Sequence, residues 1–408
     1  MRFCADVPAE EFDAFARQHP QCTLLQSDEW AHVKGGWSHI LTGLRNDDGE
    51  LVAVGLVLIR SVLPSRLRRS ATSPLAIWYL PHGPLLDYAN DEVRDTYLRQ
   101  LGRYARRKLA ILVRIDPFLA AAAASLDEFP LPPDPQIIAI GRRIERLGYR
   151  LRRFTPEKHD NIQPHFVSVV HRPDGEYAAL LSKKARTLAN NARNRFVTTE
   201  YGGDECVDDL VNVIEQTEET KGISLRSAEY YHQIFRSFGE NARIYTASLD
   251  IDDALARTRQ ARARDEAELA QCPEHAGKKR NRLTEAIQAA NKRIAELSEC
   301  RERDGQRVVL AAVLVVRFGE WSEMLYAGTN RHYGNIPAQH VLWVDAITEE
   351  FACGAQRVSL GGVAGKLDDS LMQFKSRFNP VVIEKIGEFE LSIIPPLSKI
   401  IDWRLTRH

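Results

Sequence analysis

The sequence predicts a mixed α/β protein of two domains, with a helical arm inserted into the second. Apolar runs of strand length, at 51–60 and 308–318, alternate with amphipathic helical patterns such as 91–109. A chain of 408 residues is too long for one ordinary core, so at least two domains are expected. Residues 253–304 contain no Phe, Trp or Tyr and are rich in Ala, Arg, Glu, Lys and Gln, which is typical of long helices.

The composition limits the classes of function. With 44% hydrophobic and 27% charged residues, the chain is folded and not disordered. Its formal net charge is zero, so any contact with a nucleic acid must come from local basic patches. The six cysteines are scattered without a CxxC pair, which argues against a zinc site and favours reduced thiols in a cytoplasm. We find no signal peptide and no apolar run long enough to span a bilayer, and we expect a cytoplasmic protein without a cofactor or metal.

The first 150 residues read as strands and helices in alternation. Ser27 can cap a short helix that reaches Lys34, and a pair of glycines follows. The apolar strand pattern at 110–115 ends at Asp116, just before a proline. An acidic residue at such a strand end either belongs to a site or simply caps a turn.

A second α/β unit begins near residue 151, and its first helix is expected at 176–196. On that helix Lys183, Arg186 and Arg193 lie roughly opposite the apolar face. No Asp or Glu occurs between 182 and 197. A charged outer face is often only solvated, but such a face usually mixes both signs, so this one favours a polyanionic partner.

The arm is predicted as an antiparallel coiled-coil hairpin at 253–305. Its second half carries apolar residues at 4-3-4-3 spacing, a coiled-coil seam, at Leu283, Ile287, Ala290, Ile294 and Leu297. The hairpin is inserted between a strand that ends near 250 and one that starts near 307. Its basic clusters are nearly balanced by acids, so it could bind RNA, bind a protein, help the chain to dimerise or be a solvated arm.

The segment 358–391 holds the other candidate site. A short strand stops at Gly361 and Gly362, which either contact a substrate or allow a tight turn. Lys375 follows within a helix-like pattern, flanked by Phe374 and Phe378. That setting suggests a buried stem with a directed ammonium, although an ordinary snorkelling lysine has the same pattern.

The turn at 331–338 partly resembles the phosphate loop of acyl-CoA N-acyltransferases. In that loop, Arg/Gln-x-x-Gly-x-Gly/Ala offers bare N–H groups to a pyrophosphate at a helix N-terminus. Here Arg331 and Gly334 are present, but Ile336 replaces the small residue and Pro337 removes an amide donor. The pattern therefore predicts an acyltransferase fold whose acyl donor is not CoA.

Taken in order along nearly the whole chain, several short motifs resemble the Fem family of peptidoglycan aminoacyltransferases. They are Gln26-Ser27-Asp28-Glu29-Trp30 through Lys34, Pro81-His82-Gly83-Pro84, Arg114-Ile115-Asp116-Pro117, the basic helix at 182–196, the segment 220–231, Leu360-Gly361-Gly362, Phe374-Lys375-x-x-Phe378 and Ile386-Gly387-Glu388. The chain departs from the family at Ser370, where a glycine is usual, and at Asn379-Pro380, where a glycine pair is common.

The resemblance implies two acetyltransferase-like (GNAT-like) domains, one formed by 1–150 with 381–408 and the other by 151–252 with 306–380. It also implies transfer of an amino acid from aminoacyl-tRNA to an amine on the stem peptide of a peptidoglycan precursor, either UDP-MurNAc-pentapeptide or a lipid-linked form. Because the donor ester is already activated, the reaction needs no metal and no covalent enzyme intermediate.

Site residues follow from the same resemblance. Lys34, Arg226 and Tyr230 match residues that contact the nucleotide-sugar diphosphate, and Tyr326 is a candidate match to a further tyrosine. Lys375 is suited to stabilise the oxyanion or to hold tRNA 3′ phosphates, and Asp116 to orient or deprotonate the amine. Lys183, Arg186 and Arg193 are candidates for tRNA binding, and Gly361 and Gly362 for the substrate.

The resemblance also leaves open peripheral association with the inner face of the membrane, and a homodimer or a heterodimer with a related protein. Two rival functions remain at this stage, an acyl-CoA-dependent N-acyltransferase and a non-catalytic tRNA-binding scaffold. The amino acid transferred is not specified by the sequence.

Overall fold

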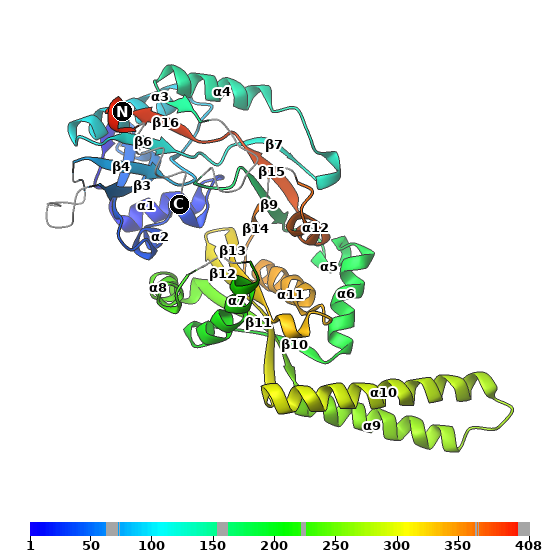
Figure 1. Cartoon of the computed structure of the whole chain (residues 1–408). Helices are drawn as coiled ribbons and strands as arrows, with labels where there is room; N and C mark the ends of the chain where they lie inside the picture. Colours follow the sequence, from blue (N-terminus) through cyan, green and yellow to red (C-terminus); the bar gives the residue numbers. More distant parts are fainter. Residues whose placement is uncertain are drawn as a thin grey trace.

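The protein, seen here as a computed structural model, is built on two eight-stranded mixed sheets with helices around them (Figure 1). The structure describes residues 1–62, 72, 74–152, 162–221, 226–363, 365 and 367–398, with no side chains described at 217–221. The expected mixed α/β class is confirmed. No helix among these residues is long and apolar enough to cross a membrane.

The first sheet has the strand order β1-β2-β3-β4-β6-β16-β8, and β5 pairs with β3. Its strands are β1 (Arg2–Cys4), β2 (Ser38–Arg45), β3 (Leu51–Ser61), β4 (Ala76–Leu80), β5 (Leu85–Leu86), β6 (Leu112–Ile115), β8 (Arg150–Leu151) and β16 (Phe389–Ser392). The helices from this part of the chain are α1 (Ala9–Gln18), α2 (Asp28–Val33), α3 (Asp91–Arg107) and α4 (Pro135–Arg146).

The second sheet has the order β10-β11-β12-β13-β14-β9-β15-β7. Its strands are β7 (Ala120–Ala124), β9 (Phe166–His171), β10 (Val197–Gly202), β11 (Ala242–Asp250), β12 (Arg307–Phe318), β13 (Trp321–Thr329), β14 (Arg357–Val363) and β15 (Val381–Lys385). The helices here are α5 (Tyr177–Leu180), α6 (Lys183–Asn194), α7 (Val207–Lys221), α8 (Ala228–Phe238), α11 (Ala338–Ala352) and α12 (Ser370–Lys375).

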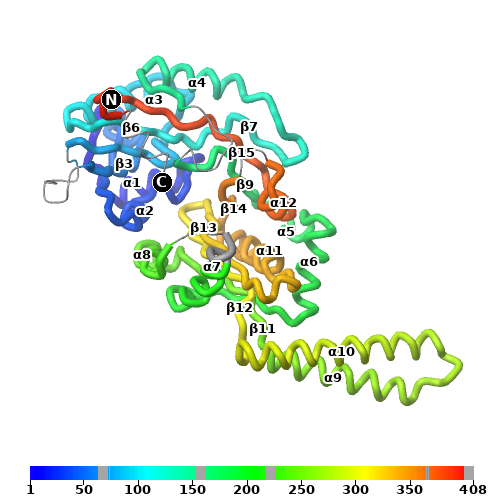
Figure 2. The backbone as a smooth tube through the Cα atoms, viewed as in Figure 1, coloured from blue at the N-terminus to red at the C-terminus, as the bar shows by residue number. Residues whose placement is uncertain are grey.

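The chain passes between the two sheets more than once. Strand β7 comes from the first 150 residues but pairs with β15 in the second sheet. Strand β16 follows β15 closely along the chain, yet it pairs with β6 and β8 in the first sheet. Figure 2 shows this C-terminal segment running along both halves of the molecule, where a half means one sheet with its helices. The expected division into two domains stays a prediction, and residues 386–388 connect the two sheets.

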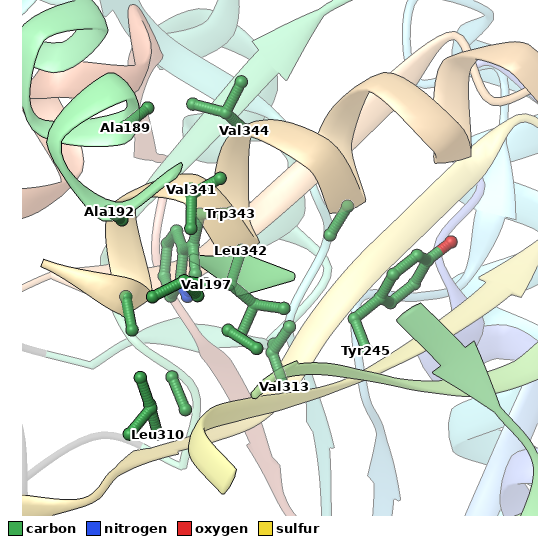
Figure 3. Close-up of a cluster of buried hydrophobic side chains, with 14 of the residues drawn as sticks. Ala189, Ala192, Val197, Tyr245, Leu310, Val313, Val341, Leu342, Trp343 and Val344 are labelled. Atoms are coloured by element: carbon green, nitrogen blue, oxygen red, sulfur yellow. The ribbon is translucent and has the colours of Figure 1, made fainter. Parts of the chain in front are cut away.

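Two large hydrophobic cores pack against opposite faces of the second sheet. On one face, the buried alanines of α6 pack with α11 against β12, as Figure 3 shows for Ala189, Ala192, Val341 and Val313. On the other face, a second cluster combines residues of both sheets and includes Leu56 of β3 and Leu314 of β12. The two halves therefore share apolar surface, which fixes their relative position.

The predicted hairpin is an arm of two helices, α9 (Ile251–Ala270) and α10 (Gly277–Asp304), which extends away from the body (Figure 1). The Asp250 side chain caps α9 by accepting a bond of 2.9 Å from the Asp253 amide. At the root of the arm, Leu255 and Leu297 are buried in the core beside the second sheet. This root anchors the arm to the body.

The helix predicted at 176–196 is interrupted. It is divided into α5 and α6 by Leu181, whose backbone is extended and whose side chain enters the core. Ser182 then caps α6, because its hydroxyl accepts a bond of 3.1 Å from the Ala185 amide. A serine inside an apolar periodicity marked a new helix start that the periodicity alone did not reveal.

Candidate functional site

A cavity of about 880 Å³ opens between α8 and the part of the chain that contains α2, β3 and β4. Strands β3 and β4 supply one wall, the end of α2 supplies a second, and residues around the start of α8 supply a third. The structure thereby brings Lys34 together with Arg226 and Tyr230, although Lys34 and Tyr230 are 196 positions apart in the sequence. The volume of the cavity is in the range found for small-molecule binding sites.

Lys34 lies at the C-terminus of α2. Ser27 caps the N-terminus of this helix, because its hydroxyl accepts a 3.0 Å bond from the Trp30 amide. The Lys34 ammonium sits 4.3 Å from the centroid of the Trp30 ring and 3.5 Å from the Tyr230 hydroxyl. Burial, together with the charge of Arg226, lowers the pKa of Lys34 to about 8. An anion in the cavity would therefore relieve both effects.

Arg226 is a second cation of this cavity, whereas Tyr326 does not line the cavity and packs against the lining residue Tyr230. The Arg226 guanidinium lies 5.2 Å from the centroid of the Tyr230 ring. The Tyr230 and Tyr326 rings meet edge to face with centroids 6.1 Å apart. Among the described residues that line the cavity, Glu229 is the acidic one, and its carboxylate forms an ion pair with Arg236. The cavity therefore presents cations without a matching carboxylate, which suits a phosphate-bearing ligand.

Lys375 ends α12, and only 4% of its surface is exposed. Its ammonium donates a 2.9 Å hydrogen bond to the Gly362 carbonyl. The flanking Phe374 and Phe378 pack with Trp343 of α11, so this part of α12 is fixed against the core. The ammonium is thus directed at the end of β14, as the spacing predicted.

The glycine pair lies beneath Lys375 and not at the cavity. Gly361 has a φ of +81°, and a Cβ added there would lie 3.7 Å from the Lys375 ammonium. A Cβ at Gly362 would come within 2.1 Å of the Pro164 ring, so no side chain fits there. Gly362 is therefore needed for packing, while Gly361 allows the turn beside the lysine.

A buried acid in this region was missed from the sequence. Glu323 of β13 accepts hydrogen bonds from the Ser359 hydroxyl at 2.9 Å and from the Trp321 indole N–H at 2.8 Å. Burial raises the pKa of Glu323, against the opposing influence of these bonds and of the charges on Lys375 and Lys385. The available signal was an acid within an apolar strand pattern, but its partner Ser359 lies on another strand and cannot be identified from the sequence.

Strand β13 connects Glu323 with Tyr326, whose ring packs against the cavity residue Tyr230. The register shift opposite Leu314 and Val315 leaves Leu325 as an extra residue in β13. Because side chains alternate along a strand, this bulge keeps Tyr326 on the same face as Glu323 and Leu325. Leu325 and Tyr326 both pack against the shared core of the two halves. Three residues of strand span about 10 Å, which is the length of β13 between Glu323 and Tyr326.

Asp116 is fully buried at the end of β6. Its two carboxylate oxygens accept bonds of 3.0 and 3.1 Å from the Lys385 ammonium. Burial raises the pKa of Asp116, and the charge of Lys385 opposes that shift. Glu388, which the sequence analysis placed in a family motif without a role, lies on the same small polar cavity, and sequence reasoning missed Lys385. The ion pair favours the orienting role for Asp116 over proton acceptance, and either role stays a prediction.

The three basic residues proposed for tRNA are placed on α6. Lys183 and Arg186 are exposed, while Arg193 forms an ion pair with Asp345 of α11. Exposed lysine and arginine without an adjacent acid on the helix leave a positive surface at the N-terminal part of α6. The side chains of Lys183 and Arg186 are therefore more available to bind a polyanion such as tRNA than the side chain of Arg193.

The loop that resembles a CoA phosphate site uses its own amides internally. The amides of Gly334, Ile336 and Ala338 donate to the carbonyls of Arg331, Tyr333 and Ile336. These bonds leave the N–H groups turned away from any phosphate. The structural evidence thus adds to the sequence argument against a CoA donor.

One cluster has the residue types of a metal site. Suitable ligand atoms of Asp28, His32 and His39 lie within 4.8 Å of one another. However, the His32 Nδ1 is 2.8 Å from the Asp28 carbonyl oxygen, and the His39 Nε2 is 3.3 Å from the Asp28 carboxylate. These contacts account for the cluster as a set of polar contacts between neighbouring side chains and backbone.

The chain matches known proteins over almost its full length. A model of the FemAB family matches residues 7–403. The chain is 24% identical to the lipid II:glycine glycyltransferase of Staphylococcus aureus over 420 residues, which cover 97% of this chain and 94% of that protein. It is 23% identical to the enzyme of the same name from Staphylococcus epidermidis over 419 residues, with the same coverage.

A crystal structure of FemX resembles the whole fold. The two share a TM-score of 0.78 at 23% identity, and the match covers 98% of this chain and 100% of the other. At this level of identity, the likeness shows a common fold.

Proposed function

Because the chain belongs to the FemAB family, we propose that it is an aminoacyltransferase that moves an amino acid from aminoacyl-tRNA to the stem peptide of a peptidoglycan precursor. The product would be part of an interpeptide bridge. The names of the glycyltransferase relatives support the acceptor, since both name lipid II. The tRNA donor and the individual residue roles are our proposals.

The observation that carries this proposal is the cationic cavity. Lys34 and Arg226 both face it, and the hydroxyl of Tyr230 is within 3.5 Å of the lysine. Paired cations in a partly desolvated cavity are suited to the diphosphate of a nucleotide-linked or lipid-linked sugar. Tyr326 supports that corner through its ring contact with Tyr230.

Lys375 is proposed to act on the donor. Its buried ammonium is positioned to stabilise the oxyanion that forms when an amine attacks the ester carbonyl. Lys183 and Arg186 would contact the tRNA backbone from α6. The internal bonding of the loop at 331–338 weighs against CoA as the alternative donor.

Either form of the precursor fits this chemistry. A soluble UDP-linked form would be used in the cytoplasm, and a lipid-linked form would require the protein to work at the inner face of the membrane. The cavity recognises the feature common to both, which is a diphosphate next to a sugar and its peptide.

The test is a transfer assay with purified protein. Total tRNA is charged with one labelled amino acid at a time and incubated with UDP-MurNAc-pentapeptide or lipid II. We expect label on one precursor, and we expect ribonuclease treatment of the tRNA to abolish it. Ribonuclease-resistant transfer of an acetyl group from acetyl-CoA would contradict the proposed donor.

A non-catalytic scaffold is distinguished by the Lys375→Met variant. Loss of one oxyanion partner should lower turnover by about 10²-fold or more, with tRNA binding retained. If the protein were a scaffold, the wild type would bind charged tRNA without transferring its amino acid, and the substitution would change nothing.

A further inference from the structure

Strands β13 and β14 run parallel side by side and then separate. Their register consists of Trp321 with Arg357, Ser322 with Val358 and Glu323 with Ser359. Beyond Ser359, the ladder of β14 with β9 is irregular until Gly362. Ligands commonly bind where parallel strands diverge at their carboxyl ends, because backbone groups and side chains there face open space.

At this point of divergence, Glu323 is linked to Gly361 through Ser359, and Gly361 lies beside the Lys375 ammonium. A Cβ on Gly361 would lie 3.7 Å from the Lys375 ammonium and 3.8 Å from the carbonyl oxygen of Met324, the residue after Glu323. The glycine thus lies between the lysine and β13. A cation for a developing oxyanion and a carboxylate for a proton are thus both connected to Gly361, and the charge of Lys375 acts on the pKa of Glu323.

The hydrogen bonds around Glu323 fix its orientation. The Gly361 amide donates to the Ser359 hydroxyl oxygen at 3.1 Å, so the hydroxyl proton is directed to one carboxylate oxygen of Glu323. The Trp321 indole donates to the other oxygen. Each oxygen keeps a second lone pair, and the residue is largely but not completely buried. The carboxylate is held in place and can still accept a proton.

We propose that Glu323 is the general base that accepts the proton of the attacking amine, with Lys375 stabilising the oxyanion. This assignment rests on the proposed function.

The reaction starts from the neutral amine. Its nitrogen forms a bond with the ester carbonyl carbon, the carbonyl electrons move to the oxygen beside Lys375, and Glu323 takes a proton from the nitrogen. When the carbon–oxygen bond to the ribose breaks, the ribose oxygen takes that proton from Glu323. The products are the amide and the free tRNA hydroxyl, and the carboxylate is regenerated.

Other groups in the region are less suited to this role. Both oxygens of Asp116 accept bonds from Lys385 in a fully buried pair. The His340 Nε2 lies 2.6 Å from the Arg377 guanidinium, which occupies its lone pair. The charged groups that act on Glu323 are Lys375 from α12 and Lys385 from β15, the latter already paired with Asp116.

The test compares the pH dependence of transfer by the wild type, Glu323→Gln and Ser359→Ala. We expect Glu323→Gln to lower kcat by about 10²- to 10⁴-fold, to leave the KM for both substrates unchanged and to remove the acid limb of the profile. Ser359→Ala removes a bond that favours the charged carboxylate, so its acid limb should move to higher pH. Melting temperatures check that both variants fold.

A Glu323→Ala variant provides a second measurement, since added formate should restore part of its activity by serving as the base. The base assignment is overturned if Glu323→Gln keeps kcat within about threefold of wild type, or if the acid limb stays in place in both variants. A wild type that transfers nothing from charged tRNA would instead overturn the proposed function, and the base assignment with it. The wild-type arm of the assay therefore separates the two failures.

Discussion

At the scale of single residues, Lys34 gives the chain a pH-dependent affinity. Its pKa is about 8 in the free protein, because burial and Arg226 disfavour its charge. A bound diphosphate supplies opposite charge and raises that pKa. Above about pH 8 the free protein holds a neutral lysine that must take up a proton on binding.

We therefore predict that the affinity for the UDP-linked precursor weakens as pH rises through about 8. Calorimetric titrations in buffers of different ionisation enthalpy should reveal proton uptake in that range. Lys34→Arg keeps its charge and provides the control, which should bind without that uptake. A wild-type affinity that is flat from pH 7 to 9.5 would show that the lysine is not at the diphosphate.

Gly362 supports a second prediction. Because an added Cβ would lie 2.1 Å from Cγ and 2.3 Å from Cβ of the Pro164 ring, the backbone must shift to admit alanine. Gly362→Ala should lower the free energy of unfolding by about 1–3 kcal/mol, measured by urea denaturation. Gly277→Ala is the matched control, since nothing lies within 4 Å of a Cβ there. Equal stabilities of the two variants would contradict the crowding.

The chemical character of single residues was easier to predict from the sequence than the residues with which they interact. The aromatic flank of Lys375 predicted a directed ammonium, and the structure has one. In contrast, the bond from Lys385 to Asp116 joins residues that are 269 positions apart. No local pattern predicts such a pair, because it depends on the order of strands in two sheets. Glu323 was missed for the same reason, as its partner Ser359 lies on another strand.

At the scale of elements, strong periodicities were predicted well. The strands β3 and β12 and the helix α3 were expected close to their observed bounds, because each is a long and regular pattern. Strand β7 was not expected, since a run of alanines from Ala120 to Ala124 has little intrinsic strand preference. Its pairing with β15 decides its conformation.

The arm can be shortened without disturbing its root. The Arg262 guanidinium donates a 3.0 Å bond to the Asn291 side-chain oxygen, so the two helices are adjacent at that level. Replacing residues 263–290 with a short Gly/Ser loop should leave Leu255 and Leu297 buried. We expect the melting temperature to change by only a few degrees.

The shortened protein also ranks the two candidate tRNA surfaces. We predict that it keeps kcat and the KM for the precursor, and that its KM for charged tRNA rises less than in the Lys183→Ala/Arg186→Ala double variant. Initial rates at several salt concentrations measure this, since contacts to phosphates weaken with salt. A larger rise in the shortened arm than in the double variant would assign the tRNA to the arm instead.

At the scale of the whole molecule, the Asp116–Lys385 pair ties the two sheets together. Asp116 follows β6 of the first sheet, and Lys385 ends β15 of the second. Removing one partner leaves a buried charge without compensation, which typically destabilises a protein by about 3–5 kcal/mol.

Lys385→Met should therefore lower the free energy of unfolding by about that amount, as measured by urea denaturation. The double variant Asp116→Asn/Lys385→Met removes both charges and should recover a large part of the loss. Additive losses in the double variant would mean that the two groups act independently.

The likeness over the whole chain was predictable because the short motifs occur in a fixed order, and the family match over residues 7–403 agrees with it. The way in which the two halves interlock was not predictable. It depends on β7 and β16 pairing with strands that are distant in sequence. Such pairings leave no local trace in composition or periodicity.

This exchange of strands limits how such a gene can change. A recombination event that replaced residues 1–150 with those of a relative would also replace β7, an edge strand of the other half's sheet. Likewise, a new C-terminal segment would alter β15 and β16, and so both sheets at once. Exchange of either segment alone would therefore change strand pairing in the sheet of the other half as well.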